Sequence, residues 1–238
     1  MANPAELLLT QLETWNTSGI RQTPSDRRDL VNDRTTVLRR HEIAMSHITA
    51  IRELLETAAQ SDLFPVDVYL GQLPTWTEMV LSYPDGWTAR AGMQQPFSMG
   101  AFDGNSLTLL RTLGPQLRPL VPSWSDGQRE SFAQSLNELI ETLRDDPTIK
   151  GDLAKYLLNL VLHMRHVLAE YELLGDFDLT RAVFLLKASV DTAADNSTDP
   201  KSKTAWERIR SVFSFGAVAT KAAIETKDIW GPLVVPGA

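Results

Sequence analysis

The chain has no cysteine among its 238 residues. This absence excludes disulfides, thiol nucleophiles, zinc–thiolate sites and iron–sulfur clusters. Small secreted scaffolds usually depend on disulfides, so we expect an intracellular, cytoplasmic protein. The opening residues, MANPAELLLTQLETW, have no basic segment before their short run of leucines, and we therefore do not expect a signal peptide.

Long apolar runs are also absent. No stretch of about 18 apolar residues occurs, so we expect no membrane-spanning helix. The glycines are scattered singly, and neither phosphate-binding glycine fingerprint is present. A Gly-x-Ser-x-Gly nucleophile elbow is missing as well. The sequence therefore predicts no cofactor and no catalytic residue, and it favours a protein that is not an enzyme.

Basic residues are scarce except near the end of the chain. The net charge is −7, yet residues 201–238 hold six basic residues against three acidic ones, a local charge of +3, which leaves −10 for the first 200 residues. An acidic body of this kind disfavours general binding to nucleic acid. The basic end could dock on the body itself, on an acidic partner or on a membrane surface.

Helical periodicity is the strongest positive signal. Two seams repeat apolar residues every three or four positions, over about 24–61 and 150–174. The first seam contains Leu30, Val37, Ala44, Ile51 and Ala58, and the second contains Leu153, Leu157, Leu160, Met164, Val167, Tyr171 and Leu174. No segment alternates with a period of two, so no sheet is expected. The sequence predicts an all-α, multi-helix bundle with two long heptad-patterned helices and a C-terminal amphipathic helix.

Start and stop signals give the limits of the helices. We expect helices over 4–18, 24–61, 65–82 (broken at Gly71 to Pro74), 105–113, 126–145, 150–174, 178–194 and 200–228. Residues 83–125 are rich in proline, glycine and aromatic residues. Either an irregular strap over the bundle or a ligand or partner loop would explain this composition. We expect one bundle domain over 1–195, followed by a linker, helix and apolar tail over 196–238.

Histidines provide the nearest approach to a metal site. His163, His166 and Glu170 have spacings of three and four, which place them on one face of a helix, and His41 could supply a further ligand. The simpler interpretation is a set of half-buried helix residues in ordinary surface pairs, so no metal is expected. His41 itself interrupts an aliphatic seam. It could fix helix register, act as a pH sensor, or bond to a neighbouring backbone or acidic group at the edge of the core.

Two arginine pairs, Arg27-Arg28 and Arg39-Arg40, give residues 21–53 a slight basic excess. A helix that binds nucleic acid normally carries a denser basic stripe. We therefore interpret both pairs as parts of solvated, salt-bridged helix faces.

The C-terminal helix is the most distinctive segment. Its apolar face and its flanking basic residues make a set of candidate partner-binding residues: Trp206, Ile209, Phe213, Arg208, Arg210 and Trp230. A basic amphipathic helix after a polar linker can bind a partner groove or lie on a membrane. The alternative is a terminal helix that docks on its own bundle and pairs with the acidic body.

These observations predict a non-enzymatic helical interaction or assembly module, oligomeric or part of a complex. Heptad seams extend readily into intermolecular packing, and the charge-asymmetric end resembles a docking element. One alternative is an enzyme or small-molecule sensor with a pocket under residues 83–125. Another is a peripheral membrane protein that uses its C-terminal helix.

Overall fold

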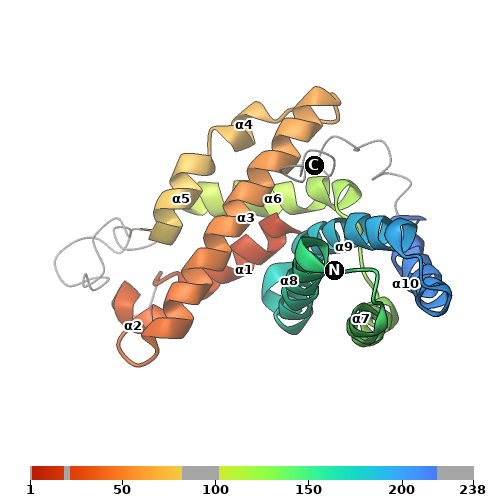
Figure 1. Cartoon of the computed structure of the whole chain (residues 1–238). Coiled ribbons are helices and arrows are strands. Elements are labelled where there is room, and N and C mark those ends of the chain that lie inside the picture. The colour runs from red at the N-terminus through yellow and green to blue at the C-terminus, as the bar shows by residue number, and fades with distance from the viewer. Residues whose placement is uncertain (1, 19–21, 82–101, 219–238) are drawn as a thin grey trace. The chain divides into compact units, whose positions relative to one another are not determined.

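The computed structural model describes residues 2–18, 22–81 and 102–218, and side chains for all of these except 214–218. The ordered elements of this part of the chain are helices, and no strand occurs among them (Figure 1). The chain is thus an all-α multi-helix protein, as the period of its apolar residues predicts.

The helices gather into two compact units that divide between Arg118 and Pro119. We call residues 2–118 the N-terminal unit and residues 119–218 the C-terminal unit. This division differs from the expected single domain over 1–195, and the helix expected after residue 196 belongs to the second unit. Periodicity alone does not show which seams face each other, so it could not place this boundary.

The N-terminal unit is built around α1 (Pro4–Trp15), which packs against α3 (Arg34–Gln60) and α6 (Gly104–Leu117). The start of α1 follows from its first residues. The Asn3 side chain accepts hydrogen bonds from the backbone N–H groups of Ala5 and Glu6, and the Glu6 carboxylate accepts one from the Asn3 N–H. This capping box satisfies N–H groups that the first turn leaves without helical partners.

The expected helix over 24–61 is interrupted in the structure. A short α2 (Pro24–Arg28) ends at Asp29, whose φ of 63° lies in the left-handed region. The chain then turns, and Asp33 begins α3 by accepting a hydrogen bond from the Thr36 N–H. The prediction of one continuous helix was therefore wrong, because the seam recorded which residues are buried and not the turn between them.

The expected helix over 65–82 is found as two pieces, α4 (Asp67–Leu70) and α5 (Leu73–Leu81), with the break near Gly71. Helix α6 extends through Pro115, and a 3-10 turn η1 (Arg118–Leu120) follows it. The predicted helix over 105–113 is therefore confirmed and is longer than expected, so most of residues 102–125 is helical and not irregular. The rest of the predicted 83–125 segment, residues 83–101, lies outside the described residues.

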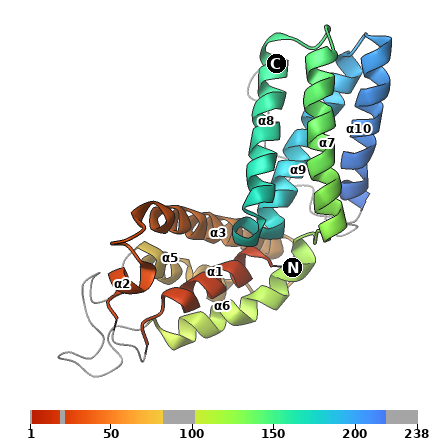
Figure 2. The same cartoon turned by 90° about the horizontal axis from the view of Figure 1, so that it is seen from below.

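The C-terminal unit is a four-helix bundle. Helix α7 (Asp126–Asp145) packs against α8 (Gly151–Ala169) and α10 (Pro200–Val218), and α9 (Tyr171–Asn196) packs against the same two helices. Short connections join consecutive helices, which places them side by side (Figure 2). The range of α7 matches the predicted helix over 126–145.

The expected helix over 150–174 ends earlier than predicted. Helix α8 stops at Ala169, and the chain starts a new turn at Tyr171. Gly175 then bends α9 with a φ of 74°, a left-handed conformation that glycine adopts without steric cost. The predicted helix end after residue 174 lies next to this bend, but the predicted seam continued across the earlier end of α8.

Candidate functional site

The apolar residues of α10 lie inside the C-terminal unit. Trp206, Ile209 and Phe213 are each 0% exposed. The Phe213 ring stacks on Phe132 of α7, with 5.6 Å between the ring centroids. In this arrangement their surface is already covered by the chain itself, and the proposed binding of a partner through them stays a prediction. Over residues 200–213 the helix docks on its own chain, which was the alternative to a partner.

A buried carboxylate fixes the position of α10. Asp146, at the end of α7, accepts hydrogen bonds from the Trp206 indole N–H at 2.8 Å and from the Ser197 hydroxyl at 2.6 Å. The backbone N–H and the hydroxyl of Thr148 donate to its other oxygen. Burial raises the pKa of Asp146, but the hydrogen bonds from Ser197, Thr148 and Trp206 outweigh this and lower it to about 2. The charged form thus joins α7, α10 and the loop between α9 and α10.

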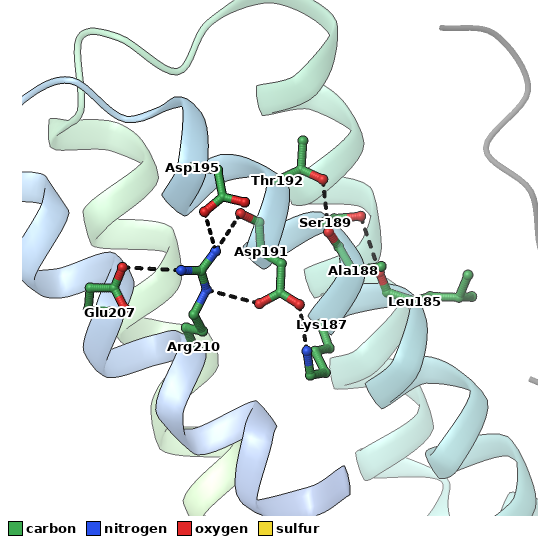
Figure 3. A network of polar contacts seen from close by, with 9 residues as sticks. All are labelled: Leu185, Lys187, Ala188, Ser189, Asp191, Thr192, Asp195, Glu207 and Arg210. Atoms are coloured by element: carbon green, nitrogen blue, oxygen red, sulfur yellow. Dashed lines mark hydrogen bonds and ion pairs between the residues drawn. The ribbon is translucent and has the colours of Figure 1, made fainter. Parts of the chain in front are cut away.

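Arg210 forms a second joint between α9 and α10 (Figure 3). Its guanidinium donates to the Asp191 carboxylate at 3.0 Å, to the Asp195 carboxylate at 2.6 Å and to the Glu207 carboxylate at 3.2 Å. Lys187 pairs with the other oxygen of Asp191 at 2.5 Å. The hydrogen bond to Asp195 is the main reason that the pKa of Arg210 rises above its ordinary value. This basic group therefore serves the docking of α10.

Arg208, the other basic candidate, pairs with Glu138 of α7 at 2.6 Å, and its side chain remains exposed. Both arginines of the predicted partner site thus contact acidic residues of their own unit. Trp230, the last candidate, lies outside the described residues.

The histidine cluster predicted as a metal candidate is a surface pair. His166 contacts Glu170 at 3.2 Å on the exposed side of α8. Desolvation lowers the pKa of His163, and electrostatic interactions with His166 and Arg181 lower it further. Among the residues with assigned positions, no group of three or more histidine, aspartate or glutamate side chains could hold a metal ion.

His41 and Arg28 form a buried cluster in the N-terminal unit. Arg28 is only 3% exposed, and its guanidinium donates to the backbone carbonyls of Met79 at 2.9 Å and Val80 at 2.8 Å. The Trp15 ring lies 4.2 Å below the guanidinium carbon and stacks on the His41 ring. The interpretation of Arg28 as a solvated residue was therefore wrong. The other arginine pair, Arg39-Arg40, is closer to the predicted salt-bridged face, because Arg39 contacts Glu42 at 2.8 Å.

The outer side of α8 carries a second strip with heptad spacing, which we call the α8 strip. It has steps of four and three and consists of Gly151, Lys155, Leu158, Leu162, Arg165 and Ala169. All six residues are exposed, and Leu158 and Leu162 have 41% and 53% of their surface accessible. The predicted seam of Leu157, Leu160, Met164 and Val167 is buried on the other side of the helix.

Comparison of the chain with family models, curated proteins and solved structures finds no match. No helix within the described ranges is both long and apolar enough to cross a membrane. Function must therefore be argued from the arrangement of the residues alone.

Sequence reasoning missed three features of this arrangement. Asp146 follows the predicted helix over 126–145, and no local pattern predicts that it binds Trp206 across the bundle. Arg28 was interpreted as a surface residue, and no local pattern predicts its burial. The α8 strip could have been found, because Leu158 and Leu162 repeat at helical spacing outside the main seam.

Proposed function

We propose that this protein is a helical interaction module and that it binds another protein through the α8 strip. The observation that carries the proposal is the presence of two heptad-spaced strips on opposite sides of α8. One strip fills the core of the bundle, and the other presents Leu158 and Leu162 to solvent. Heptad-spaced apolar residues on a helix surface are suited to packing against a further helix.

The charges of the α8 strip favour one kind of partner. Lys155 and Arg165 flank the two leucines, and no acidic residue belongs to the strip. Asp152 lies beside it and contacts Lys155 at 3.8 Å, a fully exposed pair that contributes little. Arg165 also donates to Asn137 of α7 at 2.5 Å. A helix with two apolar residues between carboxylates would complement this surface.

A second copy of the chain is a poorer occupant for the same reason. If two α8 strips packed in parallel with their leucines in register, Lys155 would meet Lys155. In the antiparallel arrangement, Leu158 would face Leu162 and Lys155 would meet Arg165. Both arrangements place like charges together, which disfavours them. The proposal therefore commits to a different protein that offers an acidic amphipathic helix.

Direct binding of synthetic helices to the full chain tests the proposal. One peptide carries leucines at heptad positions flanked by glutamates, and a second has the same leucines flanked by lysines. We expect fluorescence polarisation to detect binding of the glutamate peptide and much weaker binding of the lysine peptide. Equal binding of both peptides, or no binding of either, would contradict the proposal.

Matched variants locate the binding surface. Changing Leu158 and Leu162 together to alanine should weaken binding of the glutamate peptide about tenfold or more, because apolar anchors dominate such contacts. Leu38→Ala, at another exposed leucine on α3, should leave it unchanged. Replacing Lys155 and Arg165 with glutamate should transfer the preference to the lysine peptide. A dimer in sedimentation that the leucine changes abolish would identify a second copy as the occupant instead.

The other two predicted functions have less support. A membrane-binding role for the C-terminal helix relied on an apolar face that is buried at least as far as Phe213. A pocket under residues 83–125 depends largely on residues outside the described ranges. Neither function is favoured by a specific observation.

A further inference from the structure

The Arg28 cluster joins four helices of the N-terminal unit at one point. Trp15 ends α1, Arg28 ends α2, His41 belongs to α3, and the carbonyls of Met79 and Val80 belong to the last turn of α5. The guanidinium fits there because the last carbonyls of a helix lack helical N–H partners and carry partial negative charge.

The geometry fixes the protonation of His41. Its Nδ1 lies 2.6 Å from the Val37 carbonyl oxygen, which can only accept, so Nδ1 carries a hydrogen. Its Nε2 lies 2.6 Å from Nη1 of Arg28, which can only donate, so Nε2 must accept. A ring with one donating and one accepting nitrogen is neutral. These contacts therefore require the neutral form of His41.

Gaining a proton would turn this contact from attraction to repulsion. The new hydrogen on Nε2 would point at the Arg28 guanidinium, and two positive charges would lie on the same Trp15 ring. Among the described residues, His41 contacts the Trp15 ring from α1, Arg28 from α2 and the Val37 carbonyl from α3, and Arg28 in turn binds the carbonyls that end α5. The charge of Arg28 acts directly on the His41 ring.

Two carboxylates on the adjoining helices pair with other arginines. Glu13 of α1 pairs with Arg111 at 2.5 Å, and Glu42 of α3 pairs with Arg39 at 2.8 Å.

We propose that Arg28 and His41 form a pH-sensitive junction, which holds α1, α2, α3 and α5 together while His41 is neutral and loosens when His41 gains a proton. Desolvation lowers the pKa of His41, and the charge of Arg28 lowers it further, against the raising effect of the Val37 carbonyl. In the unfolded chain the ring takes a proton near pH 6.5. The junction is therefore stable above that pH and is weakened as the pH falls below it.

The junction also reaches the residue before the N-cap of α6. Arg28 binds the Val80 carbonyl, one residue before Leu81, and its guanidinium carbon lies 5.9 Å from the centre of the Phe102 ring. Loosening it would thus weaken the contacts of α2 with the end of α5 and with Phe102, which precedes α6. This effect is independent of binding at the α8 strip.

Nuclear magnetic resonance of the wild-type full chain gives the first test. We expect the ring signals of His41 to titrate below pH 6.5, with the hydrogen on Nδ1 in the neutral form. A midpoint at or above pH 6.5, or a neutral ring protonated at Nε2, would overturn the proposal. This measurement needs no substitution, so its outcome does not depend on whether a variant folds.

A variant gives the second test. In His41→Gln the side-chain oxygen can still accept from Arg28 but cannot gain a proton. In the wild-type full chain, the melting temperature of the N-terminal unit should fall by several degrees between about pH 7.5 and pH 5. The His41→Gln variant should remove most of this fall. His166→Gln, at an exposed histidine of the other unit, should keep the wild-type pH dependence. An unchanged dependence in His41→Gln would contradict the proposal.

Discussion

The two units of the molecule bury charges of opposite sign. The N-terminal unit encloses the cation of Arg28, surrounded by helix-end carbonyls, a neutral histidine and the Trp15 ring. The C-terminal unit encloses the anions of Asp146 and Asp176, surrounded by hydroxyl and N–H donors.

The groups around each buried charge have the hydrogen-bonding capacity that this charge needs. Carbonyl oxygens at a helix end stabilise a cation, whereas indole, hydroxyl and backbone N–H groups stabilise a carboxylate. Asp176 accepts from the Tyr171 hydroxyl at 2.5 Å and from the Trp124 N–H at 3.2 Å. Burial and this hydrogen bond raise the pKa of Tyr171, which therefore stays a donor. The comparison teaches that helices here are joined by single buried charges, each in a setting of complementary dipoles.

Removing Trp206 should have the largest effect. Trp206→Ala leaves a cavity in the C-terminal unit and takes one donor from Asp146, so we expect a loss of about 3–5 kcal/mol in the free energy of unfolding. Urea denaturation followed by circular dichroism measures it. Exposed Tyr156→Ala on α8 is the control and should change stability little. A loss below about 1 kcal/mol would mean that α10 contributes little to the bundle.

Removing Arg28 tests the buried cation in the same way. Arg28→Ala deprives the end of α5 of its donors, and we expect a loss of about 2–3 kcal/mol from the N-terminal unit. Neighbouring Arg27, which is exposed, should tolerate alanine with little change. Thermal unfolding of both variants makes the comparison, and equal stabilities would show that the buried position of Arg28 is unimportant.

Acid should act on the two units in different pH ranges. The pKa of Asp146 is lowered from 3.8 to about 2, so the stability it contributes is present above pH 3.8 and is lost as the pH falls toward 2. Asp146→Asn should remove about 2 kcal/mol at neutral pH and flatten this acid limb. His41, in contrast, acts below pH 6.5. Chemical denaturation at a series of pH values measures the stability of each unit separately. Loss of stability in the same pH range for both units would refute this prediction.

The smallest difference concerns the two arginines of α10. Arg210 contacts three carboxylates with 26% of its side chain exposed, whereas Arg208 has one partner and 64% of its side chain exposed. We expect Arg210→Ala to cost about 1 kcal/mol and Arg208→Ala less than about 0.5 kcal/mol. Urea denaturation at low and high salt measures both. Equal costs would indicate that the network around Arg210 adds nothing beyond an ordinary surface pair.

Much of the fold could be predicted from local patterns. The capping residues Asn3 and Ser125 mark the beginnings of α1 and α7, and Gly175 marks a bend. The breaks at Asp29 and Ala169 were missed, because a heptad seam continues across a turn whenever the residues on both sides are buried.

The candidate site was harder to predict. The α10 residues carry an amphipathic pattern, which is the same whether a helix packs on its own chain or on a partner. Leu158 and Leu162 matter because their side of α8 remains exposed, and exposure depends on which neighbours the helix acquires.

The sequence by itself determined that this chain is helical, where most helices begin and which residues need burial, because capping and periodicity act over a few residues along one helix. Only the tertiary structure decided that the helices form two units, that α10 docks on α7 and α9, and that Arg28 is buried beside His41. Those outcomes depend on contacts between residues far apart in the chain. Their energies arise from the pairing of surfaces and dipoles that no local pattern records.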